Sequence, residues 1–171
     1  KSYFSLNSDG SRADLIMIKG GGYRHPSSEE TLREKVVDEY GNIRSDEQGY
    51  MQGGDVFNFV IREIPRDIKK TLEYAGDTAD SFDYIVFHQA NNFINAYIAK
   101  KMKLDTDKIP STIAKYGNTS SVSVPLTIVS ELKDRLYGNK KLLLSAFGVG
   151  MTWATGIVPF VDCKISDIVE I

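Results

Sequence analysis

The sequence is poor in the residues from which disulfides and metal centres are built. Its 171 residues include one cysteine, Cys163, and two histidines, His25 and His88. A single cysteine excludes an internal disulfide and a multi-cysteine zinc site. Two histidines, one of them in a polar His-Pro loop, supply too few ligands for a histidine-based metal centre. We therefore expect no metal, and a metallohydrolase ranks last among the candidate functions.

The chain also lacks an excess of charge and long apolar runs. Its formal net charge is −2, from 21 basic and 23 acidic residues. Nucleic acid is a poor candidate partner, because its phosphates must be neutralised by basic side chains. No apolar run approaches the ~20 residues of a membrane-spanning helix. The sequence starts at Lys1 without the apolar core of a signal peptide, so we expect a soluble cytoplasmic protein, and the chain could be a piece of a longer one.

Hydrophobic residues make up 42% of the chain, which suffices for one compact domain over 1–171. Within it, the polar segment 23–54 contains Pro26 and several glycines. We expect a long loop or insertion there, in which 29–37 could form a short helix. A loop of that length in a compact domain is usually functional or mobile.

Apolar periodicity predicts the main elements. We expect strands over 13–18, 84–87, 141–147 and 152–160, and helices over 55–75, 91–102 and 120–137. Pro65 should kink or split the first of these helices, because it removes a backbone donor. Alternating strands and helices predict a layered α/β fold with a mixed sheet.

Two of the junctions between these elements carry polar side chains suited to catalysis. His88 directly follows the buried strand 84–87, and ligands of α/β sheets bind where such strands end. A core histidine satisfied by a neighbour is an equally good interpretation of His88 alone. Asn118 lies just before the last helix, where the simplest role is that of a cap for an unpaired N–H.

The third junction is a glycine turn between the last two strands, with Val149 between Gly148 and Gly150. It is either a simple hairpin or a turn that directs the Val149 N–H at an oxyanion. Each of the three signals is weak when taken alone.

Together and in this order, the junctions resemble a known family. The motifs are HQAN at 88–91, YGNTSS at 116–121 and FGVGMTW at 147–153, preceded by MQGGDVF at 51–57. They closely resemble the C-terminal half of β-ketoacyl-acyl carrier protein synthase III, a condensing enzyme of the thiolase superfamily. The likeness runs from about Leu6 to Phe160. It implies a thiolase-like α/β half, with helices layered on a mixed five-stranded sheet, in a protein that forms homodimers.

The resemblance also implies a reaction, a decarboxylative Claisen condensation in fatty acid or related biosynthesis. Acyl-CoA acylates a cysteine, and malonyl-acyl carrier protein then loses CO₂ and attacks the acyl group. His88 and Asn118 would donate neutral hydrogen bonds to the thioester oxygen, where charge develops. The Val149 N–H would form half of a second oxyanion hole. The CoA and carrier-protein thioesters are substrates, and no cofactor is implied.

Five further positions match substrate-binding positions of the family. They are Gly53, Gly54, Phe57, Asn91 and Ile94. Ordinary helix packing is the alternative role for Phe57 and Ile94.

Some positions depart from the family pattern. Cys163 follows the last strand, far along the sequence from the family's cysteine, so we interpret it as a structural or incidental thiol. The nucleophile is then expected in an N-terminal half that this chain lacks. Phe93 occupies the position of a common Arg that docks the acidic carrier protein, and the alternative basic residues are Lys100, Lys101 and Lys103. Val149 replaces a common Gly, which is harmless unless the turn needs a positive φ.

Three functions stay in competition. The leading one is the C-terminal half of a condensing enzyme, which alone should be inactive. The second is an acyltransferase of the same fold that uses an alcohol or amine; the intact His88 and Asn118 pair argues against it, since that pair suits decarboxylation. The third is a non-catalytic, thioester-binding partner subunit.

An isolated half should also expose an apolar face that normally packs on its twin.

Overall fold

The computed structural model describes residues 1–169, and the chain divides into two compact units. The larger unit consists of Lys1–Ser8, Phe57–Gly148 and the chain from Thr152 onward. The smaller unit consists of Asp9–Val56 and Val149–Met151. No helix in residues 1–169 is both long and apolar enough to cross a membrane.

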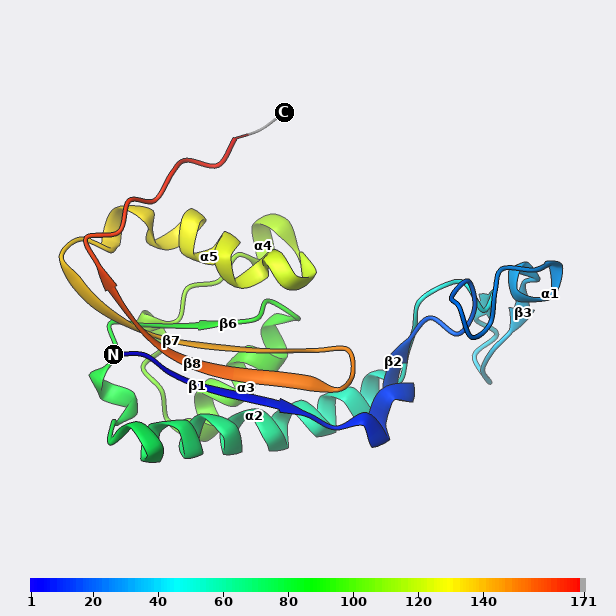
Figure 1. Ribbon diagram of the computed structural model, residues 1–171, viewed down its shortest axis with the longest axis horizontal. Helices are drawn as coiled ribbons and strands as arrows, with labels where there is room; N and C mark the ends of the chain where they lie inside the picture. Colours follow the sequence, from blue (N-terminus) through cyan, green and yellow to red (C-terminus); the bar gives the residue numbers. More distant parts are fainter. Residues whose placement is uncertain (170–171) are drawn as a thin grey trace. The chain divides into compact units, whose positions relative to one another are not determined.

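A four-stranded mixed sheet forms the centre of the larger unit (Figure 1). Its order is β1-β8-β7-β6, with the bounds β1 Tyr3–Ser8, β6 Tyr84–Phe87, β7 Asn139–Gly148 and β8 Thr152–Val161. β6 and β7 are parallel, whereas β8 is antiparallel to both β7 and β1. The predicted mixed sheet is confirmed, and three of its four strands lie where the apolar runs placed them.

Helices cover both faces of this sheet (Figure 1). On one face lie α2 (Gly53–Ala75), from Phe57 on, and α3 (Asn92–Met102), and on the other lie α4 (Ile113–Tyr116) and α5 (Ser123–Leu132). Short 3₁₀ turns η2 to η5 connect them at Ala79–Ser81, Thr106–Lys108, Ser120–Val122 and Lys133–Arg135.

β6 is buried on both of its faces, as its unbroken apolar run predicted. Val86 packs with Leu132 and Leu142 in the cluster on the α5 side. Because side chains alternate along a strand, Ile85 and Phe87 point to the opposite face, and both are at most 2% exposed.

The number of strands is a correction. The resemblance implied five, but residues 1–169 form a main sheet of four. The chain that follows α3 does not add a strand, because Pro110 has no N–H for a ladder. The N–H of Thr112, two residues further on, donates to the side-chain Oε1 of Gln89 at 3.0 Å.

α2 is continuous through Pro65, so the predicted split does not occur. It also begins at Gly53 rather than at Asp55. Proline leaves the carbonyl of Ile61, four residues earlier, without its helical N–H partner. The Nζ of Lys101 on α3 donates to that oxygen at 2.7 Å. A side chain from the neighbouring helix thus replaces the lost bond and lets the helix continue.

One of the two long predicted helices ends at its glycine, and the other is shorter than predicted. Gly76 has φ 68° and ends α2 as predicted, with the Asp77 N–H bonded to the Leu72 carbonyl at 2.9 Å. The helix predicted over 120–137 is shorter at both ends, because Ser120 has φ 55°, outside the right-handed helical range, and Lys133–Arg135 is a 3₁₀ turn. Regular α-helix therefore spans only Ser123–Leu132, between two 3₁₀ turns.

The smaller unit contains short elements only. They are η1 (Gly10–Leu15), β2 (Ile16–Met17), α1 (Glu29–Leu32), β3 (Lys35–Val36), β4 (Ile43–Arg44) and β5 (Tyr50–Met51). β2 pairs with β5, and β3 pairs with β4, both antiparallel. The polar segment 23–54 lies here, and the single-domain description of the chain stays a prediction.

The strand predicted over 13–18 is mostly wrong. The Asp9 side chain accepts the Ser11 N–H at 3.1 Å and caps a 3₁₀ turn that extends through Leu15. Only Ile16 and Met17 remain for strand pairing. A local cap therefore prevails over the apolar run.

A buried carboxylate ties β1 and β8 to α2 in the larger unit. Asp67 on α2 is 4% exposed and accepts three hydrogen bonds from the strands above it. The donors are Ser5 Oγ at 2.5 Å, Asn7 Nδ2 at 2.8 Å and Thr155 Oγ1 at 2.6 Å. Because donors from both strands converge on one side chain of α2, Asp67 holds the edge strand β1 in register with β8.

The opposite side of β1 is apolar and exposed. Phe4 is 63% and Leu6 81% exposed, while Tyr3, Ser5 and Asn7 are half-buried on the α2 side. The cluster beneath α5 is built on β6, β7 and the end of β8 rather than on β1. Phe4 and Leu6 thus expose apolar surface on this side of β1, and the packing of an apolar face on a twin half stays a prediction.

Replacing Asp67 with Ala should lower the free energy of unfolding by about 1–3 kcal/mol, because the buried Thr155 hydroxyl would be left without its acceptor. Urea unfolding followed by circular dichroism measures the change. The matched control is Glu73→Ala, at an exposed site on the same helix, which should stay within about 0.5 kcal/mol of the parent. Equal effects of the two substitutions would contradict the role given to Asp67.

Candidate active site

His88 lies at the carboxyl end of β6, beside the end of the parallel strand β7. Its main-chain N–H donates to the Ser145 carbonyl at 2.8 Å, which extends the pairing of Phe87 with Ser145 by one residue. Its carbonyl accepts Asn95 Nδ2 at 3.2 Å. The imidazole packs edge-on against the Phe147 ring, with centroids 5.2 Å apart. Bonds to β7 and α3 thus hold the backbone of His88, and contact with Phe147 restricts the orientation of its ring.

The Nδ1 atom of His88 lies 2.6 Å from the Oγ of Ser123, the first residue of α5. The ring is half-buried, and this burial lowers the pKa of His88 below its ordinary value. The imidazole is therefore neutral at neutral pH. Ser123 was not among the predicted site residues, although a serine at the start of an amphipathic helix was visible in the sequence.

A wholly buried glutamine organises the surroundings of His88. The Gln89 side chain donates to the Phe87 carbonyl at 2.8 Å and accepts the Thr112 N–H at 3.0 Å. The hydroxyls of Thr112 and Thr127 lie 2.9 Å apart, and Thr127 Oγ1 donates to the Ser123 carbonyl at 2.7 Å. This chain of bonds joins the end of β6 to the starts of α4 and α5.

Asn118 lies in the loop between α4 and η4, after Gly117, which has φ 65°. Its Oδ1 accepts the Ser120 N–H at 2.9 Å, so the side chain caps a local turn, as the simpler interpretation predicted. That bond also orients the amide, because Oδ1 is occupied while Nδ2 has no hydrogen-bond partner within residues 1–169. Asn118 is exposed, and its role as a donor to substrate stays a prediction.

Val149 belongs to the smaller unit, in the turn between β7 and β8. Within residues 1–169 the non-glycine positions with positive φ are Lys103, Ser120 and Asp162. The positive φ in the turn, 137°, is at Gly150. Valine at 149 therefore causes no backbone strain in place of glycine, and its N–H as an oxyanion donor stays a prediction.

Two of the predicted substrate-binding glycines begin α2 in the smaller unit. Gly53 and Gly54 are exposed, and a Cβ added at either would meet no other atom within 4 Å. The space beside this first helical turn is therefore open. Its use by a substrate stays a prediction.

The other three predicted binding residues lie in the larger unit. Phe57 stacks on Phe93 with ring centroids 5.5 Å apart. Asn91 caps α3 through its Oδ1, which accepts the Ile94 N–H at 2.8 Å. Ile94 is 5% exposed, so it takes part in helix packing, the alternative named for it. Contact of the three with a substrate stays a prediction.

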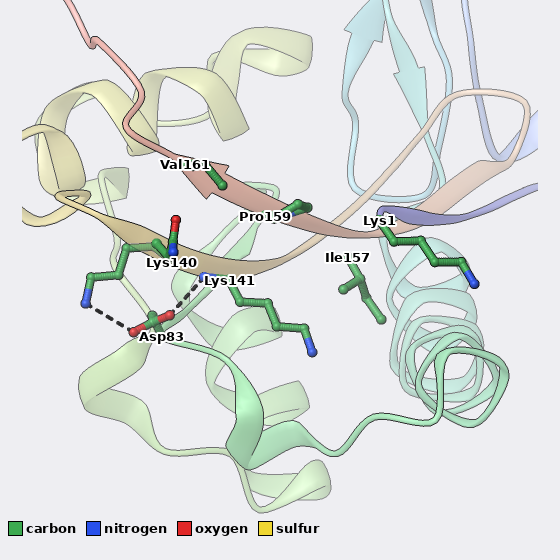
Figure 2. A pocket seen from close by; sticks show the side chains of 8 residues that line it. Lys1, Asp83, Lys140, Lys141, Ile157, Pro159 and Val161 are labelled. Atoms are coloured by element: carbon green, nitrogen blue, oxygen red, sulfur yellow. Dashed lines mark hydrogen bonds and ion pairs between the residues drawn. The ribbon is translucent and has the colours of Figure 1, made fainter.

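A separate cavity of about 310 Å³ lies at the other end of β6 and β7 (Figure 2). Asp83, just before β6, accepts the Lys141 N–H at 2.8 Å and Lys140 Nζ at 3.3 Å. The Lys141 ammonium binds Asp77 and lowers the pKa of that carboxyl. Asp83, Lys140 and Lys141 are thus already engaged with one another or with Asp77. Residues 1–169 hold no cluster of three His, Cys, Asp or Glu side chains that could bind a metal.

The lowered pKa of His88 makes stability depend on pH. The ordinary histidine pKa is about 6.5. Below that pH the His88 ring is protonated in the unfolded chain, whereas its lowered pKa keeps the ring neutral in the folded chain. The free energy of unfolding should therefore be highest above pH 6.5 and fall as the pH drops from there through the folded pKa. Urea unfolding at several pH values should show a smaller decline for His88→Gln, with parallel curves above about pH 7.5. Equal declines in both proteins would contradict a buried neutral imidazole.

Comparison with known proteins places these residues in a family. A family model described as the C terminal of 3-oxoacyl-[acyl-carrier-protein (ACP)] synthase III matches residues 72–160. A β-ketoacyl-[acyl-carrier-protein] synthase III from Streptococcus pneumoniae (strain Hungary19A-6) is 34% identical over 158 residues, covering 90% of this chain and 45% of that protein.

Solved structures give the same result. A 3-oxoacyl-(acyl-carrier protein) synthase from Burkholderia xenovorans LB400 matches with a TM-score of 0.84 and 36% identity, over 97% of this chain and 46% of that one. A 3-oxoacyl-(acyl-carrier-protein) synthase III structure matches with a TM-score of 0.84 and 35% identity, over 94% and 47%. The predicted fold class is thereby confirmed.

The chain spans about half the length of the relatives it matches. The range matched by the family model is more than half of the chain and includes His88, Asn118 and Val149. The chain therefore belongs to the family of 3-oxoacyl-[acyl-carrier-protein] synthase III C-terminal domains, as its motifs indicated.

Proposed function

We propose that this chain is the C-terminal half of an enzyme that condenses the acyl group of an acyl-CoA with malonyl-acyl carrier protein and releases CO₂, in fatty acid or related biosynthesis. The observation that carries the proposal is the half-buried imidazole of His88 at the carboxyl end of β6, with its Nδ1 atom 2.6 Å from the Ser123 Oγ. Nε2 is then the ring atom left for a substrate.

The chemistry of decarboxylation suits such a group. Loss of CO₂ from a malonyl thioester moves an electron pair toward the thioester carbonyl, and negative charge develops on its oxygen. Neutral donors fixed beforehand stabilise that charge in the transition state. Asn118, with Oδ1 bound to Ser120 and Nδ2 unoccupied within the described residues, is the proposed second donor.

The nucleophile has to come from elsewhere. Cys163 is exposed in the segment after β8, and its thiol donates a long hydrogen bond to the Val161 carbonyl, at 3.8 Å. It does not lie at a helix N-terminus, where thiolates are stabilised. We therefore assign the acylated cysteine to an N-terminal half joined to this one, in line with the half-length coverage of the relatives.

Docking of an acidic carrier protein is proposed to use exposed groups on α3. Phe93 is 68% exposed and supplies apolar contact where a basic residue is common. Lys101 is less available, because its Nζ donates to the Ile61 carbonyl and lies over the Tyr97 ring. Lys100 and Lys103 are exposed and are the better candidates.

A homodimer is proposed from the family resemblance.

An acyltransferase that uses an alcohol or amine is the second candidate. It would need a base to take a proton from its acceptor. A histidine whose Nδ1 is bound to a hydroxyl and whose pKa is lowered by burial is a weaker base, so the condensation is favoured. A non-catalytic thioester-binding subunit is the third candidate.

The test uses the longer protein in which this half is joined to its cysteine-bearing half. His88→Ala and Asn118→Ala should each lower CO₂ release from a malonyl thioester by about 10²–10³-fold, because one oxyanion donor is worth that much. Acylation of the cysteine by acyl-CoA should change far less, and Ser121→Ala is the control variant. Acylation without CO₂ release by the parent would favour the acyltransferase, and neither activity would favour the binding subunit.

The 171-residue chain alone should form no acyl-enzyme. Incubation with an acyl-CoA should leave its intact mass unchanged, because its single thiol is not activated. Cys163→Ser is the matched control for slow chemical acylation. A stoichiometric adduct that Cys163→Ser abolishes would overturn the assignment of the nucleophile to another segment.

A further inference from the structure

We infer that Ser123 sets the tautomer of His88, by donating its hydroxyl proton to Nδ1 and so placing the ring proton on Nε2. The catalytic meaning of this inference rests on the proposed function, whereas the tautomer itself is a property of the chain. Ser123 acts through His88 and is therefore a positioning residue.

Three polar groups meet at the Ser123 hydroxyl. The main-chain N–H of Gln89 points at Oγ over 3.3 Å and can only donate. The Nδ1 of His88 lies 2.6 Å from the same oxygen and can donate or accept, depending on the tautomer. One lone pair of the oxygen is thus used by Gln89, and the hydroxyl proton still needs an acceptor.

Burial decides between the two arrangements. Ser123 is 1% exposed, and its Oγ has no other hydrogen-bond partner within residues 1–169. If His88 carried its proton on Nδ1, the oxygen would accept twice and its own proton would be buried without an acceptor, which is costly. If Nδ1 is unprotonated, every group is satisfied. Donation from Ser123 to His88 is therefore the favoured arrangement.

The serine is held in place from both sides. Its carbonyl accepts Thr127 Oγ1 at 2.7 Å, and Thr127 contacts Thr112. Its oxygen is held by the Gln89 N–H, directly next to His88 in the chain. The ring of His88 packs against Phe147. The geometry that fixes the tautomer is thus built before any substrate binds.

The consequence concerns which ring atom meets a substrate. With Nδ1 accepting from Ser123, the neutral imidazole has one N–H, at Nε2, and that N–H is a donor. The opposite tautomer would present a lone pair at Nε2, which repels an oxyanion and suits a general base. A serine outside the sequence motif would thereby determine that His88 stabilises negative charge rather than removes a proton.

The test is nitrogen NMR of the chain labelled with ¹⁵N-histidine, at about pH 8, well above the usual histidine pKa. The chain has two histidines, so a His25→Gln variant assigns both rings. In the parent, Nδ1 of His88 should show the shift of an unprotonated ring nitrogen and Nε2 that of a protonated one. Ser123→Ala should give averaged shifts of mixed tautomers, and Ser123→Thr, which keeps a hydroxyl, should restore the parent pattern.

Control variants separate this effect from loss of structure. Ser121→Ala removes an exposed hydroxyl two residues away and should leave the pattern unchanged. Fluorescence of the single Trp153, packed edge-on against Phe59, reports whether each variant is folded. A proton on Nδ1 in the parent, or an unchanged Nε2–H tautomer in folded Ser123→Ala, would overturn the inference. Should Ser123→Ala unfold, the parent spectrum and Ser123→Thr still decide the question.

In the longer enzyme, Ser123→Ala should lower CO₂ release by about 10–100-fold, typical of a partner that orients a functional histidine, with Ser123→Thr recovering most of it. A parent that fails to release CO₂ would refute the proposed function and leave the NMR result standing. A parent that releases CO₂ at a rate unaffected by Ser123→Ala would refute the positioning role.

Discussion

The buried polar network at the carboxyl end of β6 is the constraint on which the rest of the site depends. Gln89, Thr112, Ser123 and Thr127 are each at most 1% exposed, and polar groups buried to that degree must find partners inside the protein. Gln89 follows β6, Thr112 precedes α4, and Ser123 and Thr127 both lie on α5. Satisfying them therefore fixes the end of β6 and the starts of α4 and α5 with respect to one another. His88, half-buried at their centre, takes its orientation from this network and from Phe147.

The buried strands agree with the sequence, whereas two of the failed predictions depend on partners that are distant along the chain. The apolar run at 84–87 predicted a strand buried on both faces, and β6 has the same bounds. This prediction needed only the apolar character of the segment itself. A break at Pro65 was equally reasonable, yet α2 continues because Lys101, forty residues away, bonds the Ile61 carbonyl. The same reasoning explains the four-stranded sheet, since the Thr112 N–H is taken by the Gln89 side chain. Neither the sequence around Ile61 nor that around Thr112 indicates which distant side chain will bond to its backbone.

The site divides in the same way. His88 and Asn118 could be found from motifs, because both lie at junctions where a short segment already has a recognisable pattern. Ser123 could not, because its contact with His88 joins residues 35 apart and exists only after β6 and α5 pack. The cap interpretation of Asn118 is correct and is compatible with catalysis, because the bond from the Ser120 N–H to Oδ1 leaves Nδ2 as the outward donor. The structural bond of Asn118 therefore does not conflict with the catalytic role proposed for it.

A protein that stabilises a developing oxyanion with histidine must hold that histidine neutral and still keep an N–H available. Burial favours the neutral ring but leaves the choice of tautomer open. The Ser123 hydroxyl, which already accepts the Gln89 N–H, determines the tautomer. Within the described chain, Nδ1 of His88 is the acceptor within reach of its proton. The Gln89 N–H, one residue from the ring it influences, thereby acts on Nε2 through Ser123. Position in the network, rather than charge, determines the chemistry of His88.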